Sequence, residues 1–367
     1  MLSELLIENY RGIKNLDLGT LGKINIIAGA NNTGKTSILE VIRSLEAPDN
    51  LRFWKAVGRR ESLGNSGVVI GTRISYYDML NSLFSYEIDG DSESINYKGR
   101  HDEKNFDVII AKETMDIYMS GKDLNDAGLY SVAGYGERID PDTEYEARVM
   151  QLSFFINGEM TRVNQIYEVP GVPLNSRSDM NKANKIAAPV IYISPVQHAQ
   201  NQLYLKSILT DPDLYEQFVE IMRQFDPGFL SINSVDGKYV VLSKNHKEGL
   251  MLNAYGDGMK KAMLLLSAVI RARDGILLLD EFETAIHVSA MKSVFEWIIK
   301  TAVALNVQIF MTSHSIEAIE SVLKCAPELQ KEMRMITMVK VENQLKVRNV
   351  DGEKAVQLMD EYGLELR

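Results

Sequence analysis

The hydrophobic positions of this chain fall into short blocks whose spacing changes twice along its length. Near the start, residues 24–28 form a compact apolar run of strand length. Residues 37–42 have the spacing of a helix, which we expect to end near Pro48. Two further short strands are predicted at 5–7 and 16–18. The first segment therefore predicts three strands followed by a helix.

From residue 190 onward, strand-length and helix-length blocks alternate. Such alternation is typical of an α/β protein with a parallel sheet. A hairpin turn is expected at Asp236-Gly237, because this dipeptide favours the left-handed backbone of a two-residue turn. The pattern predicts strands at 190–193, 275–279, 307–311, 335–340 and 344–348, a hairpin at 230–242, and helices at 203–224, 259–272, 288–304, 315–324 and 353–362.

Between about residue 50 and residue 190 the pattern is different. Alternating runs at 68–70, 73–77 and 107–110 predict strands, and Asp89-Gly90 and Asn157-Gly158 are two-residue hairpin signals. The segment has no sustained heptad repeat, so we do not expect a long coiled-coil arm. We therefore predict three parts, which are a lobe at 1–48, an antiparallel β-rich insertion at 49–189 and a second lobe at 190–367.

Composition and charge narrow the class of protein. The chain has 367 residues, of which 45% are apolar and 25% charged, and this is ordinary for a globular protein of one to three domains. Its one cysteine, Cys325, excludes a disulfide framework and a zinc site made of thiolates alone. The formal net charge of −10 argues against a protein whose whole surface coats nucleic acid, but leaves room for a local basic stripe.

The chain has no sequence typical of a membrane or targeting segment. Its first residues, MLSE, include an acid and lack the basic start of a signal peptide. The longest apolar stretch begins at Ala262 and is broken by Arg271, which is about half the length of a spanning helix. We therefore expect a cytoplasmic protein without a membrane-spanning part.

Residues 29–36 read GANNTGKT, which is a complete P-loop spacing between a predicted strand and a predicted helix. Glycines let backbone N–H groups turn inward around phosphates, and the N-terminus of the following helix attracts the same anion. We expect Lys35 to reach the β- and γ-phosphates and Thr36 to bind Mg²⁺. A chance match in a chain of this length is roughly a one-per-cent accident. The motif therefore predicts a nucleotide phosphate site.

Two acids, Asp280 and Glu281, follow the apolar strand predicted at 275–279. A buried strand that ends in two acids is what a Walker B element requires. Asp280 is expected to hold Mg²⁺, and Glu281 is expected to polarise the attacking water. Solvated acids at a strand end are the alternative interpretation, which the P-loop disfavours.

Two further segments carry candidate chemistry. The segment Thr312-Ser313-His314-Ser315 directly follows the strand predicted at 307–311, where a histidine can contact a γ-phosphate and the attacking water. A histidine that only fills packing space is the ordinary alternative. Gly256 and Gly258 precede a predicted apolar helix whose N-terminus can bind an anion. An ordinary helix cap, with Asp257 as the capping residue, explains these residues equally well.

In their order along the chain, these elements resemble the ABC-type ATPase domain of the RecF, SMC and OLD (overcoming lysogenization defect) branch. They are similar to the small stand-alone bacterial ATPases of the AAA family. Residues 7–13, IENYRGI, resemble the N-terminal strand and the N-F-R signature of that branch. Residues 280–287, DEFETAIH, are similar to its Walker B and D-loop run, and residues 312–317, TSHSIE, to its H-loop run. The resemblance covers about 1–45 and 190–367 and leaves the insertion out.

The resemblance implies an α/β P-loop NTPase fold with an ABC-ATPase-like mixed sheet, an inserted antiparallel β-rich region and a helical subdomain. It implies ATP and Mg²⁺ as cofactors. Lys35, Glu281 and His314 would be catalytic, and Thr36 and Asp280 would bind the metal. Gln197 would be the Q-loop glutamine, and residues 256–258 would be the signature motif. The implied nucleotide-binding residues are Gly29, Asn31, Asn32, Thr33, Gly34, Lys35, Thr36, Ser37, Gln197, Gly256, Asp257 and Gly258.

In that family, two domains stack head to tail around two ATP molecules. The resemblance therefore implies an ATP-dependent homodimer, in which the signature glycines of one subunit contact the γ-phosphate bound by the other. Two departures bear on hydrolysis, since Gly256 stands where the family has a serine and His287 where it has an aspartate. The residues after His314 contain no Asp-x-Asp pair, so we do not expect a fused Toprim nuclease.

Three functions are compatible with these features. The first is an ATP-gated dimer that acts in DNA transactions or anti-phage defence with a separately encoded nuclease or other effector protein. The second is a nucleotide-switched binding or regulatory protein with little turnover, which Gly256 allows. The third is a transporter ATPase subunit, which an insertion of ~140 residues after the P-loop helix disfavours. Basic residues that could line a DNA surface, or simply a solvated face, are Arg11, Lys14, Lys55, Arg59, Arg60, Lys260, Lys261, Arg271 and Arg273.

Overall fold

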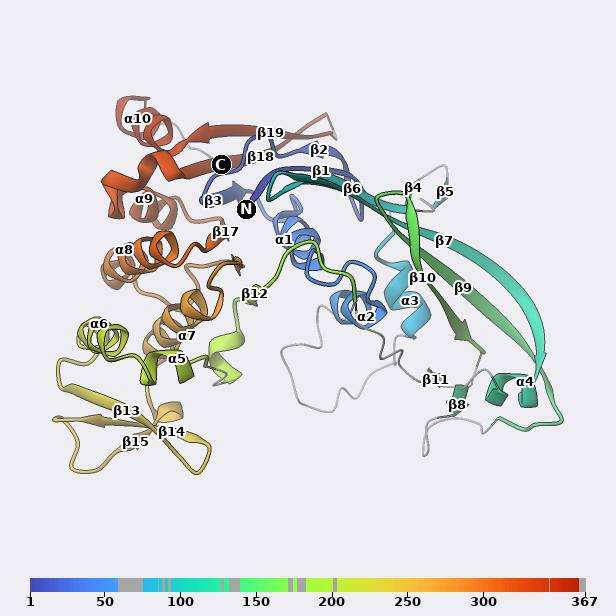
Figure 1. Ribbon diagram of the computed structural model, residues 1–367, viewed down its shortest axis with the longest axis horizontal. Helices are drawn as coiled ribbons and strands as arrows, with labels where there is room; N and C mark the ends of the chain where they lie inside the picture. Colours follow the sequence, from blue (N-terminus) through green and yellow to red (C-terminus); the bar gives the residue numbers. More distant parts are fainter. Residues whose placement is uncertain are drawn as a thin grey trace. The chain divides into compact units, whose positions relative to one another are not determined.

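The computed structural model divides the chain into two compact units (Figure 1). Unit 1 contains Met1–Glu4, Leu18–Arg43 and Ala187–Arg367, and unit 2 contains Leu5–Asp17 and Ser44–Ile186. The structure describes residues 1–58, 75–84, 86–87, 90–91, 94–126, 129–131, 139–170, 174–176, 183–200, 203–342 and 344–362.

Unit 1 is built on a mixed six-stranded sheet. All neighbouring strands run parallel except the edge strand β19, which runs antiparallel to β18. Every residue of β3, β16 and β17 is buried, which explains why the middle of each strand is apolar. Because parallel strands end at the same edge, the residues that follow these three strands gather there. In sheet order the strands are β12 (Val190–Ile193), β16 (Ile276–Leu279), β17 (Gln308–Ser313), β3 (Ile24–Gly29), β18 (Met333–Val341) and β19 (Gln344–Asp351).

Helices α7, α8 and α9 share one hydrophobic core with this sheet. Helix α7 is the most enclosed, since each residue from Lys261 to Ile270 is buried. In the part of the chain that the structure describes, no helix is long and apolar enough to cross a membrane. The larger helices of unit 1 are α1 (Lys35–Ser44, whose last residue belongs to unit 2), α6 (Pro212–Met222), α7 (Asp257–Arg271), α8 (Val288–Ala304), α9 (Ile316–Cys325) and α10 (Gly352–Tyr362). Its 3₁₀ helices are η1 (Gln197–Gln200), η2 (Leu252–Ala254) and η3 (Pro327–Glu332).

The single helix predicted at 203–224 is wrong, because the segment forms two helices, α5 (Lys206–Leu209) and α6 (Pro212–Met222). Pro212 has no N–H with which to continue a helix, and it restricts the residue before it to extended conformations. Asp211 is accordingly extended and caps α6, since its side chain accepts a hydrogen bond from the Leu214 N–H.

A small antiparallel sheet follows these helices. Strands β13 (Phe229–Val235) and β14 (Lys238–Ser243) form the predicted hairpin, and β15 (Leu250–Met251) pairs with β14. The turn is at Asp236 and Gly237, whose φ angles of 49° and 73° have the positive sign that the two-residue turn requires. The other strands and helices predicted from residue 190 onward are confirmed, with shifts of a few residues at their ends.

Unit 2 is dominated by a second six-stranded sheet with long strands. The pairs β1/β2, β6/β7, β7/β9 and β9/β10 are antiparallel, and the hairpin predicted at Asn157-Gly158 joins β9 to β10. In sheet order the strands are β10 (Glu159–Glu168), β9 (Glu144–Ile156), β7 (Lys104–Ser120), β6 (Ser94–His101), β1 (Leu2–Tyr10) and β2 (Ile13–Asp17), and the smaller elements are β4 (Tyr86–Glu87), β5 (Gly90–Asp91), β8 (Leu129–Ser131), β11 (Leu174–Ser176), α2 (Leu51–Gly58), α3 (Tyr76–Asn81) and α4 (Gly121–Asp126).

Two predictions for this region differ from the structure. Tyr76 and Tyr77, predicted at the end of a strand, begin helix α3, because Ser75 caps it by accepting a hydrogen bond from the Asp78 N–H. The lobe predicted at 1–48 is divided, because β2 and most of β1 lie in the sheet of unit 2. The strand predicted at 68–70, the start of the one at 73–77, and Asp89 lie outside the described residues.

Candidate active site

The P-loop residues lie where β3 ends and α1 begins. A Cβ atom on Gly29 would lie 2.9 Å from both the Met338 carbonyl oxygen and the Thr33 Oγ1, so this position has no room for a side chain. Asn32 and Gly34 have φ angles of 64° and 88°, which turn the loop back toward α1. Asn31 and Asn32 are exposed, whereas Ser37 is buried in the first turn of α1. Gly29 and Gly34 therefore determine the path of the loop, which leads directly into the N-terminus of α1.

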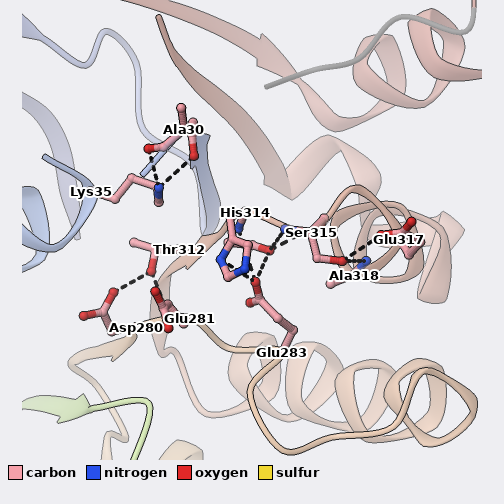
Figure 2. A network of polar contacts seen from close by, with 12 residues as sticks. Ala30, Lys35, Asp280, Glu281, Glu283, Thr312, His314, Ser315, Glu317 and Ala318 are labelled. Carbon is pink, nitrogen blue, oxygen red and sulfur yellow. Dashed lines mark hydrogen bonds and ion pairs between the residues drawn. The ribbon is translucent and has the colours of Figure 1, made fainter. Parts of the chain in front are cut away.

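Lys35 lies inside this loop (Figure 2). Its ammonium donates hydrogen bonds to the carbonyl oxygens of Gly29, at 2.7 Å, and Ala30, at 2.8 Å, and the residue is 8% exposed. Burial lowers the pKa of Lys35, and the carboxylates of Glu281 and other acids beyond β16 oppose this change. The side chain is thus a desolvated cation next to a cluster of acids.

Asp280 is the residue on which the site converges. It follows β16, is 5% exposed and accepts hydrogen bonds from three hydroxyl groups of three other elements. Thr312 Oγ1 donates to Asp280 Oδ1 at 2.7 Å, and Thr36 Oγ1 lies 3.3 Å from the same oxygen. The Tyr192 hydroxyl, from β12, donates to Oδ2 at 3.0 Å. The carboxylate is therefore held at both oxygens, between α1, β12 and β17.

Mg²⁺ suits the oxygen atoms that lie together here. It is bound in proteins by one or two carboxylates together with hydroxyl, water and phosphate oxygens. The Asp280 carboxylate and the Thr36 hydroxyl supply two such oxygens, 3.3 Å apart. Among the described residues, no group of three or more His, Cys, Asp or Glu could hold a metal ion by itself. The donor set fits a metal that shares its coordination with a nucleotide.

Glu281 has the positive φ angle of 44°, which is uncommon for a residue with a side chain. Its N–H donates to Thr312 Oγ1 at 2.8 Å, so the hydroxyl of Thr312 accepts from Glu281 while it donates to Asp280. Thr312 thus fixes both acids through one atom. The sequence presented Thr312 only as the first residue of the histidine segment, and its role depends on β17 pairing with β16.

His314 follows β17, and its side chain is 50% exposed. Its Nδ1 lies 3.4 Å from Glu283 Oε1, and its backbone N–H donates to the same oxygen at 3.2 Å (Figure 2). The next residue, Ser315, caps helix α9 by accepting a hydrogen bond from the Ala318 N–H. The histidine therefore lies on a short connection that is fixed at both ends.

Comparison with known proteins identifies this constellation. A family model described as "AAA domain, putative AbiEii toxin, Type IV TA system" matches residues 24–320. The chain belongs to this AAA family. The match contains the P-loop, both acids and His314, and the predicted resemblance to P-loop ATPases of the RecF and SMC branch is confirmed.

This AAA protein is similar to several named proteins. It is 23% identical over 347 residues to an "ATP/GTP phosphatase" of Helicobacter pylori, and this match covers 87% of each chain. A match of 44 residues, 50% identical, relates it to the "DNA replication and repair protein RecF" of Salmonella arizonae and covers 12% of each chain. Among solved structures it is similar to an SMC head bound to the C-winged helix domain of ScpA, with 13% identity, a TM-score of 0.49 and coverage of 97% of this chain and 99% of that one.

The remaining candidate residues of the AAA protein make their hydrogen bonds and ion pairs with groups other than Asp280. Gln197 begins η1, and its side chain bonds within its own connection, to the Ser194 N–H at 3.4 Å and the Tyr204 hydroxyl at 3.5 Å. Gly256 is the N-cap of α7, so the alternative that Asp257 caps this helix is wrong. Asp257 is the first residue of α7, and its carboxylate pairs with Lys260 at 2.6 Å.

The two signature glycines have different surroundings. A Cβ atom on Gly258 would lie 3.0 Å from the Ala285 carbonyl oxygen, so the first turn of α7 packs closely on the segment after Glu281. Among the described residues, a Cβ atom on Gly256 would meet nothing within 4 Å, and its φ of −65° suits any residue. Packing therefore accounts for Gly258, and no described neighbour requires a glycine at position 256.

Lys261 is not part of a basic surface, contrary to the prediction. It is fully buried in α7, with its Nζ 3.5 Å from the Pro195 carbonyl oxygen. Burial lowers the pKa of Lys261 to about 8, although Glu283, Asp280 and Glu281 favour its charged form. The other basic candidates in unit 1 divide into Lys260, whose side chain is 12% exposed, and the exposed Arg271 and Arg273.

The remaining basic candidates belong to unit 2 or lie outside the described residues. Arg11 donates a hydrogen bond to the Val57 carbonyl oxygen, and the Lys55 ammonium lies over the Tyr76 ring. Lys14 is exposed on β2. Arg59 and Arg60 lie outside the described residues.

Tyr192 offers a test of how Asp280 is held. Burial, followed by the neighbouring Asp280 carboxylate, raises the pKa of the Tyr192 hydroxyl, which therefore stays a neutral donor. In the Tyr192→Phe variant one buried carboxylate oxygen loses its donor, and we expect the free energy of unfolding to fall by about 1–3 kcal/mol. We also expect nucleotide binding to need more Mg²⁺. Urea denaturation and a Mg²⁺ titration of nucleotide binding measure the two effects, with Tyr239→Phe on β14 as control. Equal stability of both variants contradicts the assigned bond.

Lys261 gives a pH-dependent test. Between pH 8 and about 10.4, the value for an unfolded lysine, the folded protein binds fewer protons than the unfolded chain. The wild type should therefore gain stability relative to Lys261→Met as the pH rises, by about 2 kcal/mol between pH 8 and 9.5. Urea denaturation of both proteins at several pH values measures this difference. It should be constant between pH 6 and 7, where both states carry the proton, and a constant difference up to pH 9.5 contradicts the lowered pKa.

Proposed function

We propose that this AAA protein is an ATPase that binds ATP with Mg²⁺, hydrolyses it to ADP and phosphate, and dimerises head to tail around the nucleotide. One observation carries the proposal. The hydroxyl groups of Thr36, in the P-loop, and Thr312, at the end of β17, both lie within hydrogen-bond distance of the Asp280 carboxylate. This contact places the P-loop threonine next to a buried acid, and these are the two kinds of oxygen that hold Mg²⁺ beside a bound nucleotide.

The chemistry follows from the positions of the side chains. The backbone N–H groups of the P-loop and the Lys35 ammonium bind the phosphates and stabilise negative charge that develops on the γ-phosphate. When bound, Mg²⁺ neutralises charge on the phosphate oxygens, and Thr36 and Asp280 would hold it. Glu281 accepts a proton from the attacking water as general base. Its backbone is held by Thr312, so the carboxylate is carried by a fixed main chain.

The dimer is supported by Gly256. This residue begins α7 at a position with open space around it, and its own subunit gives no reason for a glycine there. A glycine does allow a close approach of the helix N-terminus to an anion on another molecule. In the proposed dimer that anion is the γ-phosphate held by the partner subunit's P-loop, as the resemblance to the RecF and SMC branch implies. ATP then stabilises the dimer by binding only to the assembled form.

The biological role that we propose is in DNA transactions or anti-phage defence, together with a separately encoded effector protein. The match to RecF, which is named for DNA replication and repair, supports the first part. The family description, which names a toxin of a toxin–antitoxin system, supports the second. A nucleotide-switched regulator with little turnover is the second candidate, because Gly256 lacks the hydroxyl of the usual signature serine.

Hydrolysis and dimerisation can be tested together. We expect wild-type protein to release phosphate from ATP, Lys35→Ala to release none, and Glu281→Gln to lose at least about 100-fold of the rate while still binding ATP. Because Glu281→Gln keeps the nucleotide, it should form an ATP-dependent dimer in size-exclusion chromatography with light scattering. GTP is measured in parallel, since the relative from Helicobacter pylori is named for both nucleotides.

Further variants test ATP hydrolysis and head-to-tail dimerisation separately. Gly256→Arg places a large side chain in open space, so it should leave the fold intact and return the Glu281→Gln protein to a monomer. If wild type and Lys35→Ala turn over equally, the protein is the regulator and not the ATPase. If Glu281→Gln stays monomeric with bound ATP, the head-to-tail dimer is wrong.

The DNA part has its own measurement. We expect a fluorescent DNA duplex to bind at low salt in the presence of ATP, and the affinity to fall as salt rises. Reversal of one exposed arginine at the end of α7, as in Arg271→Glu or Arg273→Glu, should weaken binding and lower the salt slope by about 1. Lys346→Glu, an equally large charge change on the exposed face of β19, is the control. Absence of binding at low salt removes DNA from the proposed role.

A further inference from the structure

One carboxylate oxygen of Glu283 contacts several polar groups of the histidine segment, residues 312–315. It lies two residues beyond Glu281, on the connection between β16 and α8. The Ser313 hydroxyl donates to Glu283 Oε1 at 2.8 Å, and the His314 N–H donates to the same atom at 3.2 Å. The ring Nδ1 of His314 is 3.4 Å away (Figure 2). One carboxylate oxygen thus binds the backbone of this histidine and lies next to its ring.

The surroundings of Glu283 are unusual for a residue with a purely structural task. Its side chain is 13% exposed, and Oε2 is buried without a hydrogen-bond partner among the described residues. A carboxylate in such a place costs free energy that a glutamine or an apolar residue would avoid. The opposite charge that attracts it is the buried ammonium of Lys261, on the helix that begins with the signature glycines. A carboxyl group therefore lies beside His314 at a position where a glutamine or an apolar residue would be less costly to bury.

A carboxylate next to a histidine decides which ring nitrogen carries the proton. A neutral imidazole has one donor and one acceptor nitrogen, and an ionised carboxylate can only accept. At 3.4 Å from Glu283 Oε1, an Nδ1 that carries the hydrogen presents its positive end to the carboxylate, and Nε2 is then left for a partner on the opposite side of the ring. The main chain of Glu281 is bonded to Thr312, so the two glutamates act on different groups.

We propose that Glu283 is the positioning residue of His314. It fixes the ring orientation and the Nδ1–H tautomer, so that Nε2 faces the γ-phosphate and the attacking water. This inference rests on the proposed ATPase function and adds a second glutamate to it, with a task distinct from that of Glu281. Glu283 touches neither nucleotide nor water in this proposal and acts only through His314.

The first measurement is the tautomer of His314, read from ¹⁵N chemical shifts of the histidine rings in the full-length protein without nucleotide. The chain has five histidines, and the His314→Ala variant assigns the signal. We expect Nδ1 to carry the hydrogen in the wild type. In Glu283→Ala the ring should populate the Nε2–H form, and Glu283→Gln, which keeps an acceptor oxygen, should retain most of the wild-type signal. An unchanged tautomer in Glu283→Ala overturns the proposal.

The second measurement is ATP turnover. Glu283→Ala should lower kcat at least about tenfold and leave KM within about twofold, because it disturbs a transition-state contact and not nucleotide binding. Glu283→Gln should recover part of kcat. In a His314→Ala background, Glu283→Ala should have no further effect, since one residue acts through the other. Additive losses, or a rise in KM with constant kcat, overturn the proposal.

Two controls distinguish a specific role of Glu283 from a general effect of removing an acid and from loss of the fold. Glu317→Ala removes a neighbouring exposed acid that accepts a hydrogen bond from Ser315, and it should behave as the wild type in both measurements. Thermal unfolding shows whether Glu283→Ala is folded, and Glu283→Gln decides the question if it is not. The tautomer does not depend on hydrolysis, so the ATPase assignment can fail, with wild type equal to Lys35→Ala, while the tautomer result still decides the role of Glu283.

Discussion

The site depends on one buried carboxylate that accepts hydrogen bonds from hydroxyl groups at both of its oxygens. Asp280 is 5% exposed, and the bonds from Thr312 and Tyr192 replace the water that a carboxylate loses on burial. Those bonds are available because β12, β16 and β17 are adjacent and parallel, with matched register at their carboxyl ends. The same edge receives the P-loop, since β3 is the next strand. A shift of one residue in any of these pairings would turn a donor to the opposite face of the sheet and leave the charge unsatisfied.

The segment after β16 assigns its three acids to three different tasks within four residues. The side chain of Asp280 faces the hydroxyl groups, the backbone of Glu281 is bonded to Thr312, and the side chain of Glu283 holds the histidine segment. The positive φ of Glu281 lets the chain change direction between them. Close packing of Gly258 on the Ala285 carbonyl joins this segment to the start of α7. Residues from distant parts of the sequence are therefore positioned by their contacts with one short segment, residues 280–285.

The sequence was informative where a local pattern had a physical cause. Apolar runs predicted the central strands, because strands buried on both faces have few polar positions. The P-loop and the acids followed from their places at strand ends. Tyr192 could not be found in this way, because its bond to Asp280 requires that β12 lies beside β16, and no local pattern encodes that neighbour. Lys261 was taken for a surface residue because lysines are almost never fully buried. The division of 1–48 between two sheets was hidden for a similar reason, since β1 lies beside β6, which is far from it in the sequence.

Position 256 has a consequence for how the rate of this protein is set. The residue there is the N-cap of α7, where serine and glycine differ in stability by only a few tenths of a kcal/mol. It has ordinary backbone angles and open space around it. Folding therefore imposes almost no preference between the two residues. In the ATPase that we propose, the choice of serine or glycine at this position would change the nucleotide cycle by one hydroxymethyl group, with almost no effect on folding.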